Sequence, residues 1–249
     1  MAAPLDPSRP DRAAGEGAGG GWRAHLALAM PDLAWEFLRR NRDYRADWRR
    51  SWRCPEAIAP QWGLQFAADP ALPADRAGVL WRPEIAPGLV VPFDGDPSAA
   101  GEWRAGALLK AARRTADGLH LRFESGLQLQ FCGAARVGQP LLVVLAFDRD
   151  LGLRIDAVER LNRTLSGRPS APSHWTKGQR ERLAKSLSAL DGALMGETYR
   201  QIAARLFGRH AGADEPWPTS SIRATTIRLV QSGKRLMGGG YRQLLRKGL

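Results

Sequence analysis

The chain has 249 residues, 44% of them hydrophobic and 25% charged, so it is long enough to bury a sizeable core. It has no run of about 18 apolar residues, and its first twenty residues carry Pro, Asp, Glu and Gly where a signal peptide would be apolar; we therefore expect a cytoplasmic protein, neither membrane-spanning nor secreted. Two cysteines without a CxxC pair exclude a disulfide framework and give no zinc or redox motif.

The formal net charge of +12 is unevenly distributed along the chain. Residues 168–249 contain 15 Lys and Arg against 5 Asp and Glu, whereas residues 1–167 contain 22 against 20. Excess positive charge gathered in one segment is typical of a surface that binds a phosphate backbone. A basic surface kept for solubility is the alternative, but solubility does not require this segregation.

Composition divides the chain into three parts. Residues 1 to about 21 lack periodicity and end in three glycines, which predicts disorder, and we assign 1–30 to an N-terminal tail. Residues 31–148 are expected to form a small α+β domain. Residues 149–249 are expected to form an all-α domain of the helix-turn-helix-variant type, with a proline-rich joint near 167–172.

The N-terminal half mixes helices and strands. A helix is predicted over 32–40 with Asp32 as its cap, followed by a short helix that carries Tyr44 and Trp48. Its many tryptophans are expected either in the core or at a domain joint, or else as exposed anchors for a protein partner; they are Trp35, Trp48, Trp52, Trp62 and Trp81.

Short extended segments are predicted at 79–81 and 89–93, and a hairpin is predicted over 119–131. There, apolar residues alternate with polar ones on both sides of Ser125-Gly126. The apolar run 141–147 is expected to be the central strand of the same sheet, and His120 is expected to be exposed.

The C-terminal third predicts a succession of helices. After a helix over 151–165, leucines at helical spacing between 183 and 194 indicate the first helix of the DNA-binding module. A second helix begins after Thr198 and ends at Gly208, and a third, capped by Thr219 or Ser220, runs to about Ser232. The glycines at 238–240 are expected to stop it.

The third helix has two different faces. At 100° per residue, its packing side contains Ile222, Thr226, Leu229 and Val230. The opposite side is small, polar and basic, with Ser221, Ala224, Thr225, Arg228 and Gln231. Arg can donate two hydrogen bonds to guanine, Gln can pair with adenine, and short side chains permit close approach, so this composition predicts a recognition helix.

Hydroxyl groups at the start of this helix and basic residues around it are predicted to hold phosphates. The full set of predicted DNA-binding residues is Arg200, Arg205, Thr219, Ser220, Ser221, Arg223, Thr225, Arg228, Gln231, Lys234 and Arg235. The alternative is that the hydroxyls are only caps and the arginines only solvated. About a dozen residues separate the second and third helices, where the simple motif has three or four.

Two stretches of the C-terminal third, LSALDGALMGETYRQIAARLFG from Leu187 and WPTSSIRATTIRLVQSGKRLMGGGYRQLL from Trp217, resemble a proteobacterial family of helix-turn-helix-variant regulators of integrative and conjugative elements. PDLAWEFLRRNRDYRADW from Pro31 and GVLWRPE from Gly78 resemble the transcriptional regulator-like domain that precedes it in two-domain members.

This resemblance implies an activator of excision or conjugative-transfer genes that binds double-stranded DNA. It also implies a protein partner, because stand-alone copies of the C-terminal domain act as antiactivators by binding the activator. RNA polymerase is another candidate partner. A protein-interaction module, acting as an antiactivator or adaptor, remains the alternative function.

Enzymatic activity is not expected. The four histidines are scattered, no carboxylate triad is evident, and no spaced Arg-His-Arg-Tyr set of an integrase is present. The sequence therefore predicts no catalytic residue, no metal site and no cofactor.

Overall fold

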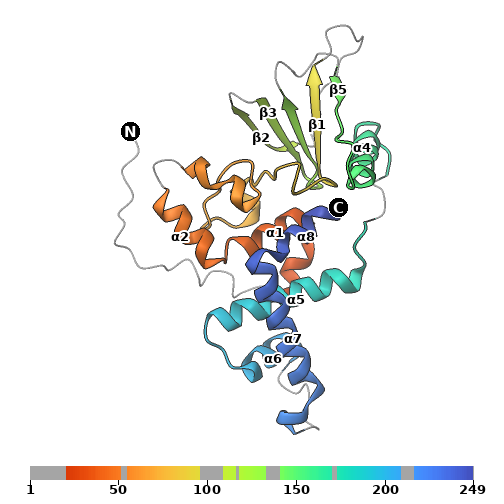
Figure 1. Cartoon of the computed structure of the whole chain (residues 1–249). Helices are drawn as coiled ribbons and strands as arrows, with labels where there is room; N and C mark the ends of the chain where they lie inside the picture. Colours follow the sequence, from red (N-terminus) through yellow and green to blue (C-terminus); the bar gives the residue numbers. More distant parts are fainter. Residues whose placement is uncertain are drawn as a thin grey trace.

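A computed structural model describes residues 21–51, 55–95, 109–115, 118–132, 141–169, 173–208 and 216–248. The sheet lies at one end of the molecule, and α5 (Lys177–Leu194), α6 (Tyr199–Phe207) and α7 (Ser221–Arg235) lie towards the opposite end (Figure 1). Helices α1 (Met30–Leu38) and α8 (Tyr241–Arg246) lie between them. The predicted α+β class is confirmed.

The predicted N-terminal tail is too long. Residues 1–20 lie outside the described part, but Trp22–Ala27 form a 3-10 helix (η2) that packs on α5. Trp22 is buried among residues of α5, α6 and α7. Arg180 of α5 fixes the end of this segment by donating to the carbonyl oxygens of Leu26 and Leu28, at 3.1 and 2.8 Å. Burial of Trp22 and the two hydrogen bonds of Arg180 together hold this segment against the helices.

Helix α1 is buried on all sides, which changes the role of Asp32. Ala29 is its N-cap, and the side chain of Asp32 does not cap the helix. The Asp32 carboxylate instead forms a buried ion pair with Arg122 of the sheet, whose Nη1 also donates to the Val79 carbonyl oxygen at 3.0 Å. The prediction of a cap was wrong because this turn faces another element and not solvent.

Aromatic side chains fill the space beside α1. Helix α2 (Arg42–Arg50) is capped by Asn41 and places Tyr44 edge-on against Trp35 and Trp62. Three short helices follow α2 in the described chain: η3 (Pro55–Ile58), η4 (Pro60–Trp62) and α3 (Ala74–Ala77). Trp35 and Trp81 are fully buried, so core packing is their role, whereas Trp52 lies outside the described residues.

In the part of the chain that the structure describes, the sheet has five strands in the order β2-β3-β4-β1-β5. Their bounds are β1 Val90–Gly95, β2 Leu109–Thr115, β3 Gly118–Phe123, β4 Gln128–Cys132 and β5 Leu141–Val143. Strands β1 and β4 are parallel, and the predicted hairpin is confirmed as the antiparallel pair β3–β4, with Leu119 opposite Phe131. Helix α4 (Leu151–Leu165), also predicted, packs Ala157 and Leu161 against the sheet.

Two predictions about the sheet were wrong. The apolar run 141–147 supplies the edge strand β5 and not the central one, and Leu142 and Phe147 are 46% and 94% exposed. His120 is only 3% exposed and packs edge-on against Phe66, 4.9 Å between ring centres. Because the segment from Leu64 to Trp81 covers the second face of the sheet, polar positions of β3 are buried as well.

One hydrophobic core contains side chains from both halves of the chain. Leu33 and Phe37 of α1 share it with Leu187 of α5 and Tyr241 of α8. The Tyr241 hydroxyl donates to the Trp62 carbonyl oxygen at 2.8 Å, and burial raises its pKa to about 12. The helices at the centre of Figure 1 therefore connect the sheet end to the α5–α7 end through packed side chains.

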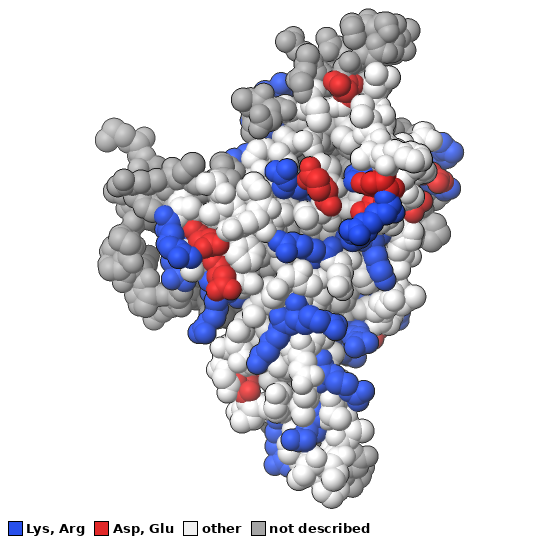
Figure 2. All heavy atoms as spheres, viewed as in Figure 1, with Lys and Arg blue, Asp and Glu red and all other residues white. Residues whose placement is uncertain are grey.

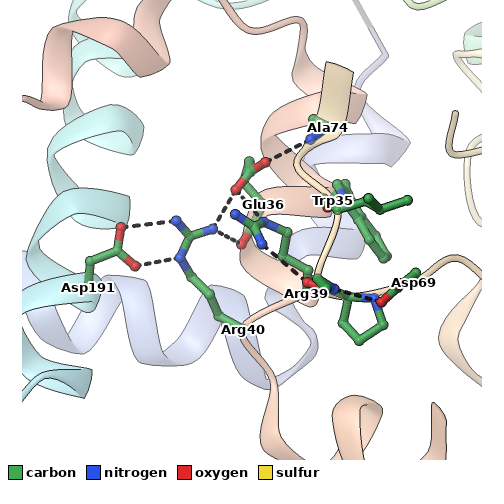
Figure 3. Close-up of polar contacts among 10 residues, drawn as sticks. Trp35, Glu36, Arg39, Arg40, Asp69, Ala74 and Asp191 are labelled. Atoms are coloured by element: carbon green, nitrogen blue, oxygen red, sulfur yellow. Dashed lines mark hydrogen bonds and ion pairs between the residues drawn. The ribbon is translucent and has the colours of Figure 1, made fainter. Parts of the chain in front are cut away.

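Charged residues also join α1 to α5 (Figure 3). This ionic cluster, here called the α1–α5 joint, consists of Glu36, Arg39, Arg40 and Asp191. Arg40 donates twice to Asp191, at 2.5 and 3.0 Å, and its Nη1 lies 2.5 Å from Glu36 Oε2. Burial alone would raise the pKa of Glu36, but the charges and hydrogen bonds of Arg40 and Arg39 outweigh it and hold that pKa below 4.5. Glu36 is thus an ionised carboxylate inside the protein.

Candidate nucleic-acid interface

Helices α5, α6 and α7 form a three-helix bundle at the basic end of the molecule. Its core contains Ala184, Ile202, Leu206, Leu229 and Val230. The predicted cap Thr198 is confirmed: its hydroxyl accepts from the Gln201 amide, while the Gln201 side chain accepts from the Thr198 amide. Gly208, with φ of +96°, ends α6 as predicted.

Helix α7 passes very close to α5 at Gly233. A Cβ atom at this position would lie 2.6 Å from the Ser186 carbonyl oxygen and 2.9 Å from Leu190 Cβ. Only glycine fits without displacement, so the backbones of the two helices approach each other closely here. This contact fixes the position of the outer face of α7 relative to the rest of the protein.

The start of α7 is set by Ser220, one of the two caps that the sequence allows. Its hydroxyl is buried and accepts from the Ile222 amide at 3.2 Å. Thr219 belongs to the 3-10 turn η5 (Trp217–Thr219), is exposed, and donates its hydroxyl hydrogen to the Pro216 carbonyl oxygen. Ser220 is therefore a capping residue, whereas Thr219 and Ser221 lie at the surface.

The outer face of α7 is a continuous exposed stripe, here called the α7 stripe. It consists of Ser221, Ala224, Arg228, Gln231, Lys234 and Arg235. The opposite side of the helix buries Thr226, Leu229 and Val230, while Ile222, Thr225 and Ile227 are half-buried between the two sides. The predicted division into a packing face and an outward face is present, but Thr225, predicted on the outward face, and Ile222, predicted on the packing face, are only half-buried.

Arg228 lies in the middle of the stripe. Its Nε donates back to the Ala224 carbonyl oxygen at 3.3 Å, which directs the two terminal nitrogens away from the helix backbone. Within the described residues, Arg228 forms no ion pair. A guanidinium held by its Nε can present both Nη groups to one planar acceptor pair.

Other predicted phosphate contacts surround the stripe. Arg200 of α6 is exposed and lies 5.5 Å from the ring centre of Trp217, and Arg223 is 3.4 Å from the Pro218 carbonyl oxygen. Figure 2 shows Lys and Arg side chains from the middle of the molecule down to the end formed by α5–α7. Most Asp and Glu side chains on this view lie higher, towards the sheet and α2.

Arg205 is placed differently from the other predicted residues. Its guanidinium donates to the hydroxyl and the carbonyl oxygen of Ser188 at 2.6 and 2.9 Å, and pairs with Glu197 at 2.9 Å. It therefore ties α6 to α5 and does not join the α7 stripe. The spacing of α6 places Arg205 off its apolar face, but it cannot show that α5 offers acceptors there.

The glycines at 238–240 bend the chain and do not stop it. Residues Leu236–Gly240 form a π-helical turn (η6) in which Gly239 has φ of +123°. This kink leads directly into α8, which returns to α1. The predicted break at the glycines is present, and its effect is to join the outward helix to the central core.

No group of three His, Cys, Asp or Glu side chains in the described ranges is arranged to hold a metal ion. Among those same residues, no helix is both long and apolar enough to cross a bilayer.

Comparison with known families matches both parts of the chain. Residues 144–246 match a family described as "T6SS, Transcription factor, DNA binding domain", and residues 22–67 match the "Proteobacterial transcriptional regulator-like domain". No curated protein matches the chain. The first match contains α4 to α8 and so includes the whole α7 stripe. The chain is therefore a DNA-binding transcriptional regulator, and the two matches agree with the resemblance of its N-terminal part to a regulator-like domain and of its C-terminal part to a DNA-binding domain.

Proposed function

We propose that the protein is a sequence-specific transcriptional activator that inserts the α7 stripe into the major groove of double-stranded DNA. The observation that carries this proposal is the stripe itself, because small, polar and basic side chains face outward on a helix whose other side is locked into the core. A helix in the major groove needs this composition to approach base edges closely.

Within the stripe, Arg228 and Gln231 are the proposed base-reading residues. Arg228 would donate its two Nη groups to the N7 and O6 atoms of a guanine, and Gln231 would pair with an adenine. Arg200, Arg223, Thr225, Lys234 and Arg235, with Thr219 and Ser221, would contact phosphates and fix the register. Arg205 is left out, because its guanidinium is engaged by Ser188 and Glu197.

Two classes of target gene follow from the resemblances. The family resemblance points to excision and conjugative-transfer genes of a mobile element, whereas the matched DNA-binding family carries T6SS in its description. RNA polymerase and an element-encoded antiactivator are the proposed protein partners. The alternative function, a module that only binds another regulator, predicts that the full chain does not retain DNA at low salt.

The experiment is a salt-titrated selection of genomic promoter fragments with the full-length protein, followed by sequencing of the retained DNA. We expect one enriched motif, with affinity that falls steeply as the salt concentration rises. The genes beside the enriched sites then decide between the two target classes. Absence of enrichment would favour the protein-interaction function.

Substitutions test the proposed roles. Arg228→Ala is expected to weaken binding to the enriched motif roughly 5- to 150-fold and to relax the preference at one base pair. Arg235→Ala is expected to weaken binding to all sequences alike and to lower the salt slope by about one. Arg49→Ala, the same change at an exposed arginine of α2, is the matched control. Equal affinity of Arg228→Ala and the parent would refute the assignment.

A further inference from the structure

A surface cavity of about 320 Å³ lies between α5, the end of α6 and α7. It opens beside the α7 stripe and is lined by residues from all three helices of the bundle. This volume falls at the lower end of the range of protein sites that bind small molecules. The described residues that line the cavity all belong to these helices.

The lining of the cavity combines an apolar floor with a cationic rim. Half-buried Phe207 and buried Leu229 are its apolar floor, and the exposed Arg182 and Arg228 are its rim, while Lys185 is half-buried. Among the described lining residues the one carboxylate is Glu181, whose Oε2 lies 4.0 Å from Lys185 Nζ. Within the described part of the chain neither Arg182 nor Arg228 forms an ion pair, so the rim keeps a positive excess.

Lys185 is fixed between aromatic rings. Its Nζ lies 4.5 Å from the ring centre of Trp22 and 5.8 Å from that of Phe207. These contacts hold the ammonium at the inner side of the cavity. The two arginines, Arg182 on α5 and Arg228 on α7, line the same cavity and are exposed.

We propose that this cavity binds a small organic anion with a planar apolar body, such as an aromatic carboxylate. The carboxylate would meet the arginines, while the ring would cover Phe207 and Leu229. A DNA phosphate would satisfy the rim but would leave the apolar floor without a partner. The combination of floor and rim therefore favours an amphipathic ligand over an inorganic anion.

Arg228 belongs both to the cavity and to the α7 stripe, so an anion bound in the cavity and DNA in the groove compete for one guanidinium. The cavity is thus an effector site whose ligand lowers the affinity for DNA. This second step rests on the proposed function, whereas binding of the anion does not. The two statements can be tested separately.

The binding test uses the full-length protein without DNA, with 2-naphthoate as the probe and tryptophan fluorescence as the signal. We expect saturable binding of one molecule per chain with a dissociation constant of about 1 mM or below. Arg182→Gln should weaken it roughly fivefold or more, and Phe207→Leu should weaken it as well, whereas Arg49→Gln on α2 should not. Uncharged 2-naphthamide lacks the negative charge and inorganic phosphate lacks the apolar ring, so both should bind far more weakly.

The competition test measures affinity for a selected DNA site as the 2-naphthoate concentration rises. We expect the affinity for DNA to fall at least about tenfold when 2-naphthoate saturates the cavity. Absence of saturable binding, or equal binding of 2-naphthamide, would overturn the site. Binding without any loss of DNA affinity would overturn its role as an effector site. If the parent protein binds 2-naphthoate but no DNA, the proposed function fails and the cavity stands.

Discussion

The α1–α5 joint gives a quantitative prediction for Glu36→Gln. This change keeps the size of the side chain and its acceptor for the Ala74 amide, which donates to Oε1 at 2.9 Å. It removes the negative charge that faces Arg39 at 2.7 Å and Arg40 at 2.5 Å. The substituted protein therefore retains the packing of α1 and loses two buried ion pairs.

The magnitude follows from what the two arginines still contact. Removing one partner of a buried ion pair costs about 3–5 kcal/mol, because the other charge stays buried. Arg40 keeps both hydrogen bonds to Asp191, and Arg39 keeps the Pro70 carbonyl oxygen. We therefore expect the unfolding free energy to fall by about 2–3 kcal/mol, at or below the low end of that range. Such a loss lowers Tm by roughly 4–12 °C.

The pH dependence gives an independent check. Because the pKa of Glu36 is lower in the folded protein than its ordinary value of 4.5, the carboxylate stabilises the fold above that pH. This contribution is lost as pH falls below 4.5 towards the folded pKa. The difference between parent and variant should shrink over that range. Burial and Arg40 lower the pKa of nearby His25, whereas Glu36 raises it, so the variant lowers the His25 pKa further.

The assay is urea unfolding of both proteins at neutral and acidic pH. Glu159→Gln is the matched control: Glu159 pairs with Arg163 at 2.9 Å on the surface of α4, and its removal should change stability by less than about 0.5 kcal/mol. If Glu36→Gln unfolds within about 0.5 kcal/mol of the parent at neutral pH, the buried-pair reasoning is wrong.

Three further changes test the bundle and its connection to the core. Gly233→Ala places a Cβ 2.6 Å from the Ser186 carbonyl oxygen, so urea unfolding should show a loss of about 1–3 kcal/mol; an unchanged midpoint would contradict the close α5–α7 contact. Gly239→Ala forces a side chain onto φ of +123° and should destabilise the protein by roughly 1–3 kcal/mol, which calorimetry would detect; equal stability would argue against the kink. Thr198→Ala should cost about 1 kcal/mol in the same measurement, whereas Thr198→Ser should restore the cap; equal effects of the two would exclude a capping role.

Features that depend on neighbouring residues could be predicted from the sequence. The hairpin of β3 and β4, the helix 151–165 and the Thr198 cap each follow from spacing and turn chemistry within about 15 residues. The two faces of α7 follow from the same periodicity, because apolar and polar residues alternate at helical spacing. These predictions needed no knowledge of distant partners.

Features that depend on a distant partner could not be predicted. Asp32 and Arg122 are 90 residues apart, and Arg40 and Asp191 are 151 apart, so nothing local marks these charges as buried. His120 alternates as an exposed strand residue should, yet Phe66 covers it. The apolar run 141–147 was predicted to be the central strand, yet it supplies the edge strand β5. Hydrophobicity alone cannot tell an edge strand from a central one.

The same limit applies to the candidate site. Arg228 and Gln231 could be assigned to one face from the helical wheel, but the internal contacts of Arg205 depend on the position of α5. Arg182 and Lys185 gave no signal in the sequence, since cations on an amphipathic helix are ordinarily solvated. They become significant only when α7 places Arg228 across the cavity from them.

The packing of α8 on α1 has a consequence for synthesis of the protein. Asn41, the N-cap of α2 just after α1, donates to the carbonyl oxygen of Met237 in η6, the turn that leads into α8, 196 residues further along the chain. At about 5–20 residues per second, ribosomes need on the order of 10–40 s to make that interval. Until then the apolar surface of α1 lacks the partner that covers it. A chain that ended before residue 236 would contain α5, α6 and α7 but would lack the η6 and α8 residues that pack against α1.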